Sequence, residues 1–197
     1  LDADEGFRAD TSLEALAKLR PSFAKDGTVT AGNASQISQG AAALLVASEA
    51  KAKALGIAPL AVIEGWNTVG VPAKELFIAP KIGIEQLLAK HKLTVKDIDL
   101  FEINEAFAAQ VLADITPLGI PESKLNIGGG GIALGHPIGA SGARVLTTLV
   151  HHLKRTGGTR GIASLCLGGG NAVSMLIRAV WSPSQGKGPP HRRVGRA

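Results

Sequence analysis

The sequence predicts a layered α/β domain in which helices cover a largely buried sheet. Short, apolar, strand-like runs alternate with helix-like segments along most of the chain. Apolar residues make up 45% and charged residues 19% of the 197 residues, which is enough to build a core. The chain also has 25 glycines, where an average composition would give about 14. They cluster in a few places, which indicates tight loops with close backbone approach.

The first 58 residues are the least regular part of this prediction. Leucines recur at helical spacing over Thr11–Leu19, and either of the first two residues there can cap a short helix. Thr28–Ala31 is β-branched and extended. Gln39–Leu55 is rich in alanine and predicts a second helix, because its residues are strong helix formers. The start of this helix, Ala41–Ala47, is almost entirely apolar, so we expect it to be buried on most sides.

From residue 60 onward the alternation is regular. We expect a strand, a helix, a strand and two helices over Leu60–Trp66, Lys81–His91, Ile98–Ile103, Ala106–Ile115 and Ser141–Arg155. Thr94 and Asp97 have the spacing of a capping box for a short turn. Ile162–Leu167 and Ala172–Val180 are two strands separated by three glycines, which predicts a hairpin.

The basic charge of the chain is concentrated near its end. Of the 21 basic residues, four lie in Ser182–Ala197, which has no acidic residue, so 17 basic residues face 16 acidic ones elsewhere. This near-neutral body argues against a nucleic-acid interface. Ser182–Ala197 is rich in Pro, Gly and Arg without periodicity, so we expect a disordered tail. No apolar stretch reaches the ~18 residues of a membrane-spanning helix, so we expect no membrane partner.

Cysteine and methionine usage adds three expectations. The one cysteine excludes an internal disulfide framework and a zinc site built from cysteines, so we expect no metal site. A single thiol fits a reduced compartment, and the expected location is the cytoplasm. The chain starts at Leu1 and its one methionine is Met175, so we also expect that further residues precede Leu1.

Two loops place polar side chains at the end of a strand or the start of a helix. Asn104 and Glu105 directly follow a predicted strand, where open α/β sheets bind ligands. The alternative is that Asn104 only caps the next helix. His136 lies in Gly135–Gly142, behind the glycine run 128–131, and an imidazole there can act as a general base near neutral pH. The alternative is a loop histidine that bonds to the backbone; a phosphate loop is disfavoured because the Walker pattern is absent.

The third loop follows Cys166, which borders three glycines whose N–H groups can face a developing oxyanion. The alternative is that Cys166 is simply a small buried residue. Asn104 and His136 are 32 residues apart, and His136 and Cys166 are 30 apart, which is about one strand–helix unit each. We therefore expect all three side chains to converge at one edge of the sheet.

These motifs resemble a known family. Asn104–Phe107, Gly135–Gly142 and Cys166–Gly170, in this order and spacing, closely resemble the second half of thiolases, the acetyl-CoA acetyltransferases and 3-ketoacyl-CoA thiolases. Gly32–Ser35, with Gly40–Ala43 behind it, is similar to the segment that leads back from the CoA-binding loop of that family. The resemblance extends from about residue 11 to residue 180.

The resemblance implies a fold and a division of the chain. The fold is a layered α/β/α domain with a mixed, mainly buried sheet. Residues 1–58 would be the end of the thiolase N-terminal half, with its loop region and its last strand and helix. Residues 59–181 would be the C-terminal domain, and residues 182–197 lie beyond the usual end of the family.

The resemblance also implies ping-pong acyl transfer, as Claisen condensation of two acyl-CoA molecules or as thiolytic cleavage of a 3-ketoacyl-CoA. By this analogy His136 activates the nucleophilic cysteine, and Cys166 moves the proton at the substrate α-carbon or the CoA sulfur. Asn104 holds a water that stabilises one oxyanion together with His136, and the Gly168 N–H contributes to the second oxyanion hole.

The same analogy assigns the binding residues. Ser35 and Ala106 match positions that line the pantetheine tunnel, and Phe107 would form a wall of the acyl pocket. Coenzyme A and acyl-CoA are then substrates, and no covalently bound cofactor is expected. The family forms dimers and tetramers, so we expect a homo-oligomer of the complete protein.

The chain departs from the family pattern in ways that leave other functions open. The nucleophilic cysteine of thiolases lies in the first half, before the point that matches Leu1, so the partner we expect is that N-terminal half. Gly128 replaces a usual Asn, and Gln36, Ser38 and Gln39 replace a common Gly-x-Asn-Asp. One alternative is a CoA-thioester-binding or regulatory protein without turnover. Another is a self-sufficient dyad of Cys166 and His136.

Overall fold

A computed structural model describes Asp2 and residues 5–180. The elements in chain order are α1 (Leu13–Ala17), α2 (Glu49–Ala54), β1 (Ala61–Gly70), the 3-10 helix η1 (Ala73–Ile78), α3 (Ala79–His91), η2 (Val95–Asp97), β2 (Leu100–Ile103), α4 (Ala108–Leu118), η3 (Glu122–Lys124), α5 (Gly131–Leu134), α6 (Ile138–Thr156), β3 (Arg160–Leu167) and β4 (Asn171–Ala179). The tail predicted over residues 182–197 lies outside the described residues.

The four strands form one mixed sheet in the order β1-β4-β3-β2. β2 pairs with β3 in parallel, and β4 pairs antiparallel with both β3 and β1. The parallel pair is joined through helices, as parallel strands require, and β3 and β4 form the predicted hairpin. The mixed α/β sheet is therefore confirmed.

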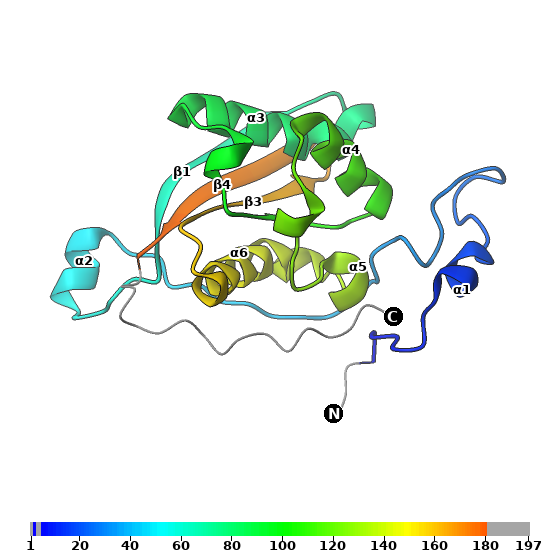
Figure 1. The fold of residues 1–197 in the computed structure, drawn as a ribbon, viewed down its shortest axis with the longest axis horizontal. Coiled ribbons are helices and arrows are strands. Elements are labelled where there is room, and N and C mark those ends of the chain that lie inside the picture. The colour runs from blue at the N-terminus through cyan, green and yellow to red at the C-terminus, as the bar shows by residue number, and fades with distance from the viewer. Residues whose placement is uncertain (1, 3–4, 181–197) are drawn as a thin grey trace.

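Helices cover both faces of this sheet (Figure 1). On one face, Ile84 of α3 and Val111 of α4 belong to the same buried cluster as Phe101 of β2. On the other face, Leu149 of α6 packs in a second cluster with Ala163 of β3. Every residue of β2 is buried, whereas β1, at the edge, is largely exposed. The two apolar clusters fix the strand ends between two helical layers, which gives the predicted α/β/α arrangement.

The expected helix over Gln39–Leu55 is wrong for most of its length. Only Glu49–Ala54 is helical, capped by the Ser48 hydroxyl, which accepts from Lys51 N. Residues 41–48 are extended and exposed, with Leu45 80% and Val46 68% accessible. Helix propensity is a weak preference, and a mostly apolar helix needs tertiary packing around it, which this segment lacks on most sides.

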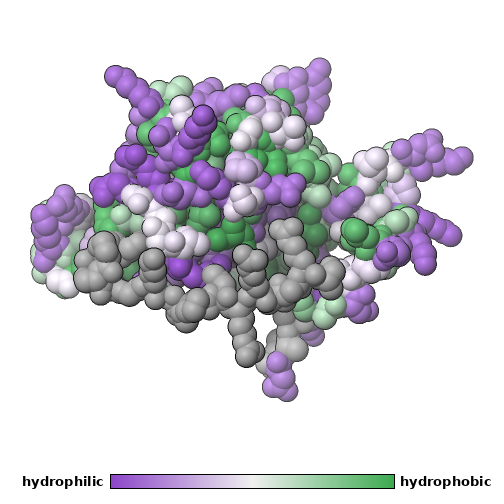
Figure 2. Space-filling model, in the orientation of Figure 1, coloured by the Kyte–Doolittle hydropathy of each residue, from purple (hydrophilic) through white to green (hydrophobic). Residues whose placement is uncertain are grey.

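The strand expected over Thr28–Ala31 is wrong, because the structure has only an isolated bridge between Pro21 and Thr30 there. The other elements follow the prediction with shifts of a few residues. Ser12 caps α1, and both hydrogen bonds of the Thr94–Asp97 capping box are present. α4 begins two residues later than predicted, at Ala108, and α6 begins three residues earlier, at Ile138. Among the described helices, none is both long enough and apolar enough to cross a membrane. In the view of Figure 2, hydrophilic side chains project around the periphery, with hydrophobic residues between them.

Candidate active site

The candidate site lies where the parallel strands β2 and β3 end. Ile103 of β2 is in register with Ser164 of β3, and Asn104 continues the ladder, since its N–H donates to Ser164 O at 2.9 Å. Cys166 follows two residues further along β3. Parallel strands bring their carboxyl ends to the same edge, so two of the predicted site residues come from adjacent strand ends.

Asn104 and His136 form a direct pair. The Asn104 side chain is almost fully buried, and its Nδ2 lies 3.3 Å from His136 Nε2. His136 sits between α5 and α6, where its own N–H donates to Gln36 O at 3.2 Å. Asn104 is not the cap of the next helix, because α4 starts after Phe107, which makes no side-chain cap. The predicted convergence of these two groups is therefore observed.

The hydrogen bonds around His136 assign its neutral tautomer. The Ser141 hydroxyl donates its one proton to Pro137 O at 3.0 Å, and His136 Nδ1 lies 2.6 Å from the same hydroxyl oxygen. With the hydroxyl proton assigned to Pro137 O, Nδ1 carries the ring proton and donates it to Ser141. Nε2 is then unprotonated and accepts from Asn104 Nδ2. The alternative in which His136 serves only to bond to the backbone does not describe these contacts.

Burial keeps this imidazole neutral. The pKa of His136 is lowered, first because burial disfavours the charged ring and then because of the positive charge of Arg144. Arg144 Nη2 also lies 3.4 Å from Asn104 Oδ1. A neutral ring whose Nε2 carries no proton is the form that can accept one in general-base catalysis.

The glycines at and near the histidine loop make room for neighbouring side chains. The Glu105 carboxylate accepts from Asn126 Nδ2 at 2.7 Å and from Ile132 N at 3.1 Å. A methyl group on Gly130 would collide with this carboxylate. Gly135 has φ of +92° and faces Ser38, so a side chain there would be strained and would clash. These contacts confirm that the glycines permit close approach.

Gly128, where the family usually has Asn, faces His152 of α6. A Cβ at Gly128 would lie against the His152 ring. His152 Nδ1 in turn lies 3.2 Å from Glu102 Oε1, and both side chains are buried. The departure at Gly128 therefore makes space for a buried histidine beside an acidic residue.

Cys166 and Gly168 lie at the end of β3. Cys166 is a half-buried free thiol. Burial raises its pKa, and the negative charge of Asp114 adds to this effect. Gly168 is exposed in the turn after β3, and its carbonyl accepts from Asn171 Nδ2 at 3.4 Å. In the described part of the chain, no hydrogen bond joins the Cys166 thiol to Asn104 or His136. The structure thus joins two of the three groups and places the third on the adjacent strand.

The predicted binding residues form a neighbouring group. Ser35 N donates to Ala106 O at 3.0 Å, and Ala34 pairs with Phe107 in an antiparallel bridge. The Phe107 ring makes an edge contact with Phe77, with ring centroids 5.4 Å apart. Residues 33–35 and 106–108 therefore lie side by side although they are far apart in sequence.

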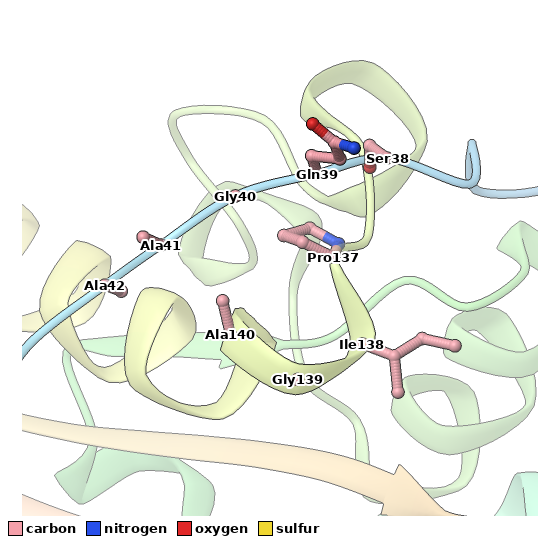
Figure 3. Close-up of a pocket in the computed structure, with 9 residues that line it drawn as sticks. All are labelled: Ser38, Gln39, Gly40, Ala41, Ala42, Pro137, Ile138, Gly139 and Ala140. Atoms are coloured by element: carbon pink, nitrogen blue, oxygen red, sulfur yellow. The ribbon is translucent and has the colours of Figure 1, made fainter.

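Two cavities adjoin the histidine loop. The smaller one has a volume of about 250 Å³ and is lined by Ser35, Gln36, Ile37, Ser38, His136 and Ile138. The larger one, of about 480 Å³, lies between the extended segment 38–42 and the start of α6, and its lining has no titratable side chain (Figure 3). Within residues 5–180 no cluster of acidic, His or Cys side chains is suited to hold a metal. The smaller cavity is therefore the candidate substrate site.

Sequence reasoning missed two residues that contact the pair. Ser141 belongs to the recognised histidine motif, and its position five residues after His136 was available as a signal. Arg144 gave a weaker signal, since one basic residue near the start of an amphipathic helix usually faces solvent. In the structure its side chain is only 19% exposed.

A mixed sheet between two helical layers, with an amide–imidazole pair at its parallel strand ends, is the arrangement that the sequence motifs predicted for a thiolase C-terminal domain. Family models agree: the thiolase C-terminal domain matches residues 57–179, and the thiolase N-terminal domain matches residues 1–50. The chain belongs to the thiolase family.

Individual relatives show how much of the family the chain represents. It is 55% identical over 174 residues to a probable acetyl-CoA acyltransferase of Staphylococcus aureus strain N315, covering 88% of this chain and 44% of the relative. The crystal structure of the Bacillus anthracis acetyl-CoA acetyltransferase superposes with a TM-score of 0.87 at 50% identity, over 90% of this chain and 45% of that one. Human mitochondrial 3-ketoacyl-CoA thiolase in complex with CoA gives 0.85 at 45% identity, over 91% and 46%. The chain spans about half the length of these relatives.

Proposed function

We propose that this chain supplies the acid–base groups of an acyl-CoA acyltransferase of the thiolase type. The observation that carries the proposal is the Asn104–His136 pair, in which Nε2 of a neutral imidazole is free of its proton and His136 lines a cavity. The relatives of this chain are named as acyl-CoA acyltransferases and thiolases. An imidazole nitrogen that carries no proton is what activation of a thiol nucleophile requires.

In the first stage, the nucleophilic cysteine comes from the half of a thiolase that this chain does not span. Nε2 of His136 takes the proton of that thiol, and the resulting thiolate attacks the thioester carbonyl of an acyl-CoA. A sulfur–carbon bond to the enzyme forms as the bond to the CoA sulfur breaks. The departing sulfur takes a proton from Cys166, so the acyl-enzyme is left with Cys166 as a thiolate and with His136 protonated.

In the second stage, the Cys166 thiolate removes a proton from the α-carbon of a second acyl-CoA, and the carbanion attacks the carbonyl of the acyl-enzyme. A carbon–carbon bond forms as the bond to the enzyme sulfur breaks, and that sulfur takes back its proton from His136. Thiolytic cleavage follows the same steps in reverse, so one set of groups serves both directions. The raised pKa of Cys166 suits this task, because a thiol that holds its proton at neutral pH is a proton donor. The raised pKa also makes the Cys166 thiolate a stronger base, which helps it to remove a proton from the weakly acidic α-carbon of the substrate.

Oxyanion stabilisation is assigned to Asn104 and Gly168. A water held by Asn104, together with His136, would stabilise one thioester oxyanion, and the Gly168 N–H would contribute to the second. Each such donor contributes about 3–4 kcal/mol to transition-state stabilisation. We assign CoA to the cavity beside His136, with Ser35 and Ala106 along the pantetheine arm and Phe107 against the acyl group. The complete protein is proposed to be a homo-oligomer.

A chimaera tests this function. The chain replaces the matching second half of the Bacillus anthracis acetyl-CoA acetyltransferase, and CoA-dependent cleavage of acetoacetyl-CoA is measured with the parent enzyme as positive control. We expect turnover, and His136→Ala should lower kcat by about 10²–10⁴-fold with little change in KM. The matched control is His151→Ala, on the exposed face of α6. A folded chimaera that binds CoA by calorimetry but does not turn over would favour a non-catalytic CoA-binding protein.

A further inference from the structure

One buried cation lies directly behind the Asn104–His136 pair. Arg144 of α6 points its Nη2 at Asn104 Oδ1 over 3.4 Å, and its Nη1 lies 4.0 Å from Glu102 Oε2. Glu102 and Asn104 are two residues apart at the end of β2, so their side chains lie on the same face of the sheet, toward α6. Glu102 is also held from its other side by His152.

This contact fixes which way the Asn104 amide points. A guanidinium only donates, so Arg144 requires the amide oxygen on its side, and Nδ2 must then face His136. That orientation matches the tautomer set by Ser141, in which Nε2 accepts. If the amide were reversed, its oxygen would face the Nε2 lone pair and its NH₂ group would face a cation. Both contacts would be repulsive.

The contacts of Arg144 are not those of a residue kept for stability. Its Nε and Nη1 are buried and make no hydrogen bond to any described group. Burial lowers the pKa of Arg144, and the charges of Glu102 and Glu105 only partly offset this. Replacing a buried, incompletely paired charge by an apolar side chain is often neutral or stabilising. The fold alone would therefore be served as well by a residue such as Met.

We infer that Arg144 is a positioning residue: by holding Asn104 Oδ1, it directs Nδ2 toward His136 and keeps the amide in the orientation that acyl transfer uses. This inference rests on the proposed function for its catalytic consequence. The geometric part concerns the amide and the imidazole alone and is measurable without turnover. Glu102, which His152 contacts, faces Arg144 from the far side.

The positive charge of Arg144 has a second effect. It faces His136 and opposes protonation of the ring, while the acidic groups on the same side, Glu102 and Glu105, face Arg144 itself. His152 is the other titratable group of this cluster, and it contacts Glu102. Loss of Arg144 should therefore raise the pKa of His136. Because the general base must be unprotonated, the acidic limb of the pH–rate profile would move to higher pH.

The test uses the chimaera with Arg144→Met, Arg144→Lys and, as matched control, Arg155→Met on the exposed last turn of the same helix. We expect Arg144→Met to lower kcat about 10- to 100-fold at nearly constant KM. The acidic limb of its pH–rate profile should move to higher pH. Arg144→Lys should keep the limb near its parent position but not restore kcat, since an ammonium lacks the planar fork. The inference would be overturned if Arg144→Met kept the parent kcat and the parent acidic limb of the pH–rate profile. It would also be overturned if the substitution changed KM alone.

A second measurement separates this inference from the proposed function. In the same protein labelled with ¹⁵N-histidine, the His136 ring should titrate at higher pH in Arg144→Met than in the parent, and its Nε2 resonance should change, with Arg155→Met unchanged. If the parent chimaera is inactive, the proposed function fails while this titration still decides the role of Arg144. If Arg144→Met does not fold, Arg144→Lys alone tests the role of Arg144. A kcat equal to that of the parent in this variant would overturn the inference.

Discussion

Asp114 makes the stability of this fold depend on pH in an unusual direction. The residue lies on α4 with no solvent exposure, where its carboxyl group accepts from Gln110 Nε2 at 2.6 Å and from Lys81 N at 3.1 Å. Burial outweighs these two hydrogen bonds and raises the pKa from 3.8 to about 7. Folding therefore favours the protonated acid.

The sign and size of the effect follow from this shift. The stabilising contribution is complete below the unfolded pKa of 3.8 and is lost as the pH rises, until it has gone above the folded pKa of about 7. Over that window the unfolded chain is ionised and the folded chain still holds the proton. At 1.36 kcal/mol per pKa unit, the free energy of unfolding falls by about 4 kcal/mol.

Asp114→Asn should remove this dependence, because an amide has the same shape and no charge. Its Oδ1 still accepts from Lys81 N. Its NH₂ group can donate to Gln110 Oε1 once that amide turns, and this oxygen is buried without a hydrogen bond in the described structure. We therefore expect the variant to be more stable than the parent by up to about 4 kcal/mol at about pH 8, with the difference vanishing near pH 4.

The measurement is urea denaturation followed by far-UV circular dichroism at a series of pH values. The difference between parent and variant isolates Asp114 from every other group that titrates. The exposed Asp26→Asn serves as control and should follow the parent at all pH values. If Asp114→Asn and the parent lose stability in parallel as the pH rises, the carboxyl is not buried as the protonated acid and the reasoning is wrong.

Two further predictions concern the thiol and the glycine run. Alkylation of Cys166, the one thiol of the chain, should have its pH midpoint above that of an ordinary cysteine, and Asp114→Asn should lower that midpoint; an unmoved midpoint would disprove the electrostatic link. Gly130→Ala drives a methyl group into the Glu105 carboxylate and should reduce the free energy of unfolding by about 1–3 kcal/mol in denaturation experiments. Gly139→Ala in α6 meets no atom within 4 Å and should instead stabilise by up to about 1 kcal/mol, so equal losses in both would contradict this account.

The sequence predicted the sheet well because its strands are short apolar runs bounded by glycines and helices. Ile162–Leu167 and Ala172–Val180 were predicted as a hairpin and are observed as β3 and β4. The segment 41–48 failed for a physical reason. The periodicity of a short apolar run does not distinguish a buried helix from a buried strand, and only the surrounding structure decides whether the segment is helical. Here that segment is extended and mostly exposed, and the fold does not surround it.

The candidate site was predicted in part for a similar reason. Asn104 and His136 follow a strand and precede a helix, so their convergence follows from topology and spacing, and the 3.3 Å contact confirms it. Arg144 and Asp114 lie on helices, where one charged residue most often faces water. Their burial depends on which helix face packs on the sheet. A single residue type does not reveal that, although both side chains alter the groups predicted to be catalytic.

Burial sets the protonation of the two proposed proton carriers in opposite directions. It lowers the pKa of the imidazole and raises that of the thiol, so both are neutral near pH 7, one as a base and one as an acid. The charges behind them strengthen this division, since a cation, Arg144, acts on His136 and an anion, Asp114, acts on Cys166. Because Asp114 itself titrates near pH 7, its effect on the thiol grows only as the solution becomes alkaline. The division between acid and base is therefore most pronounced on the alkaline side of neutrality.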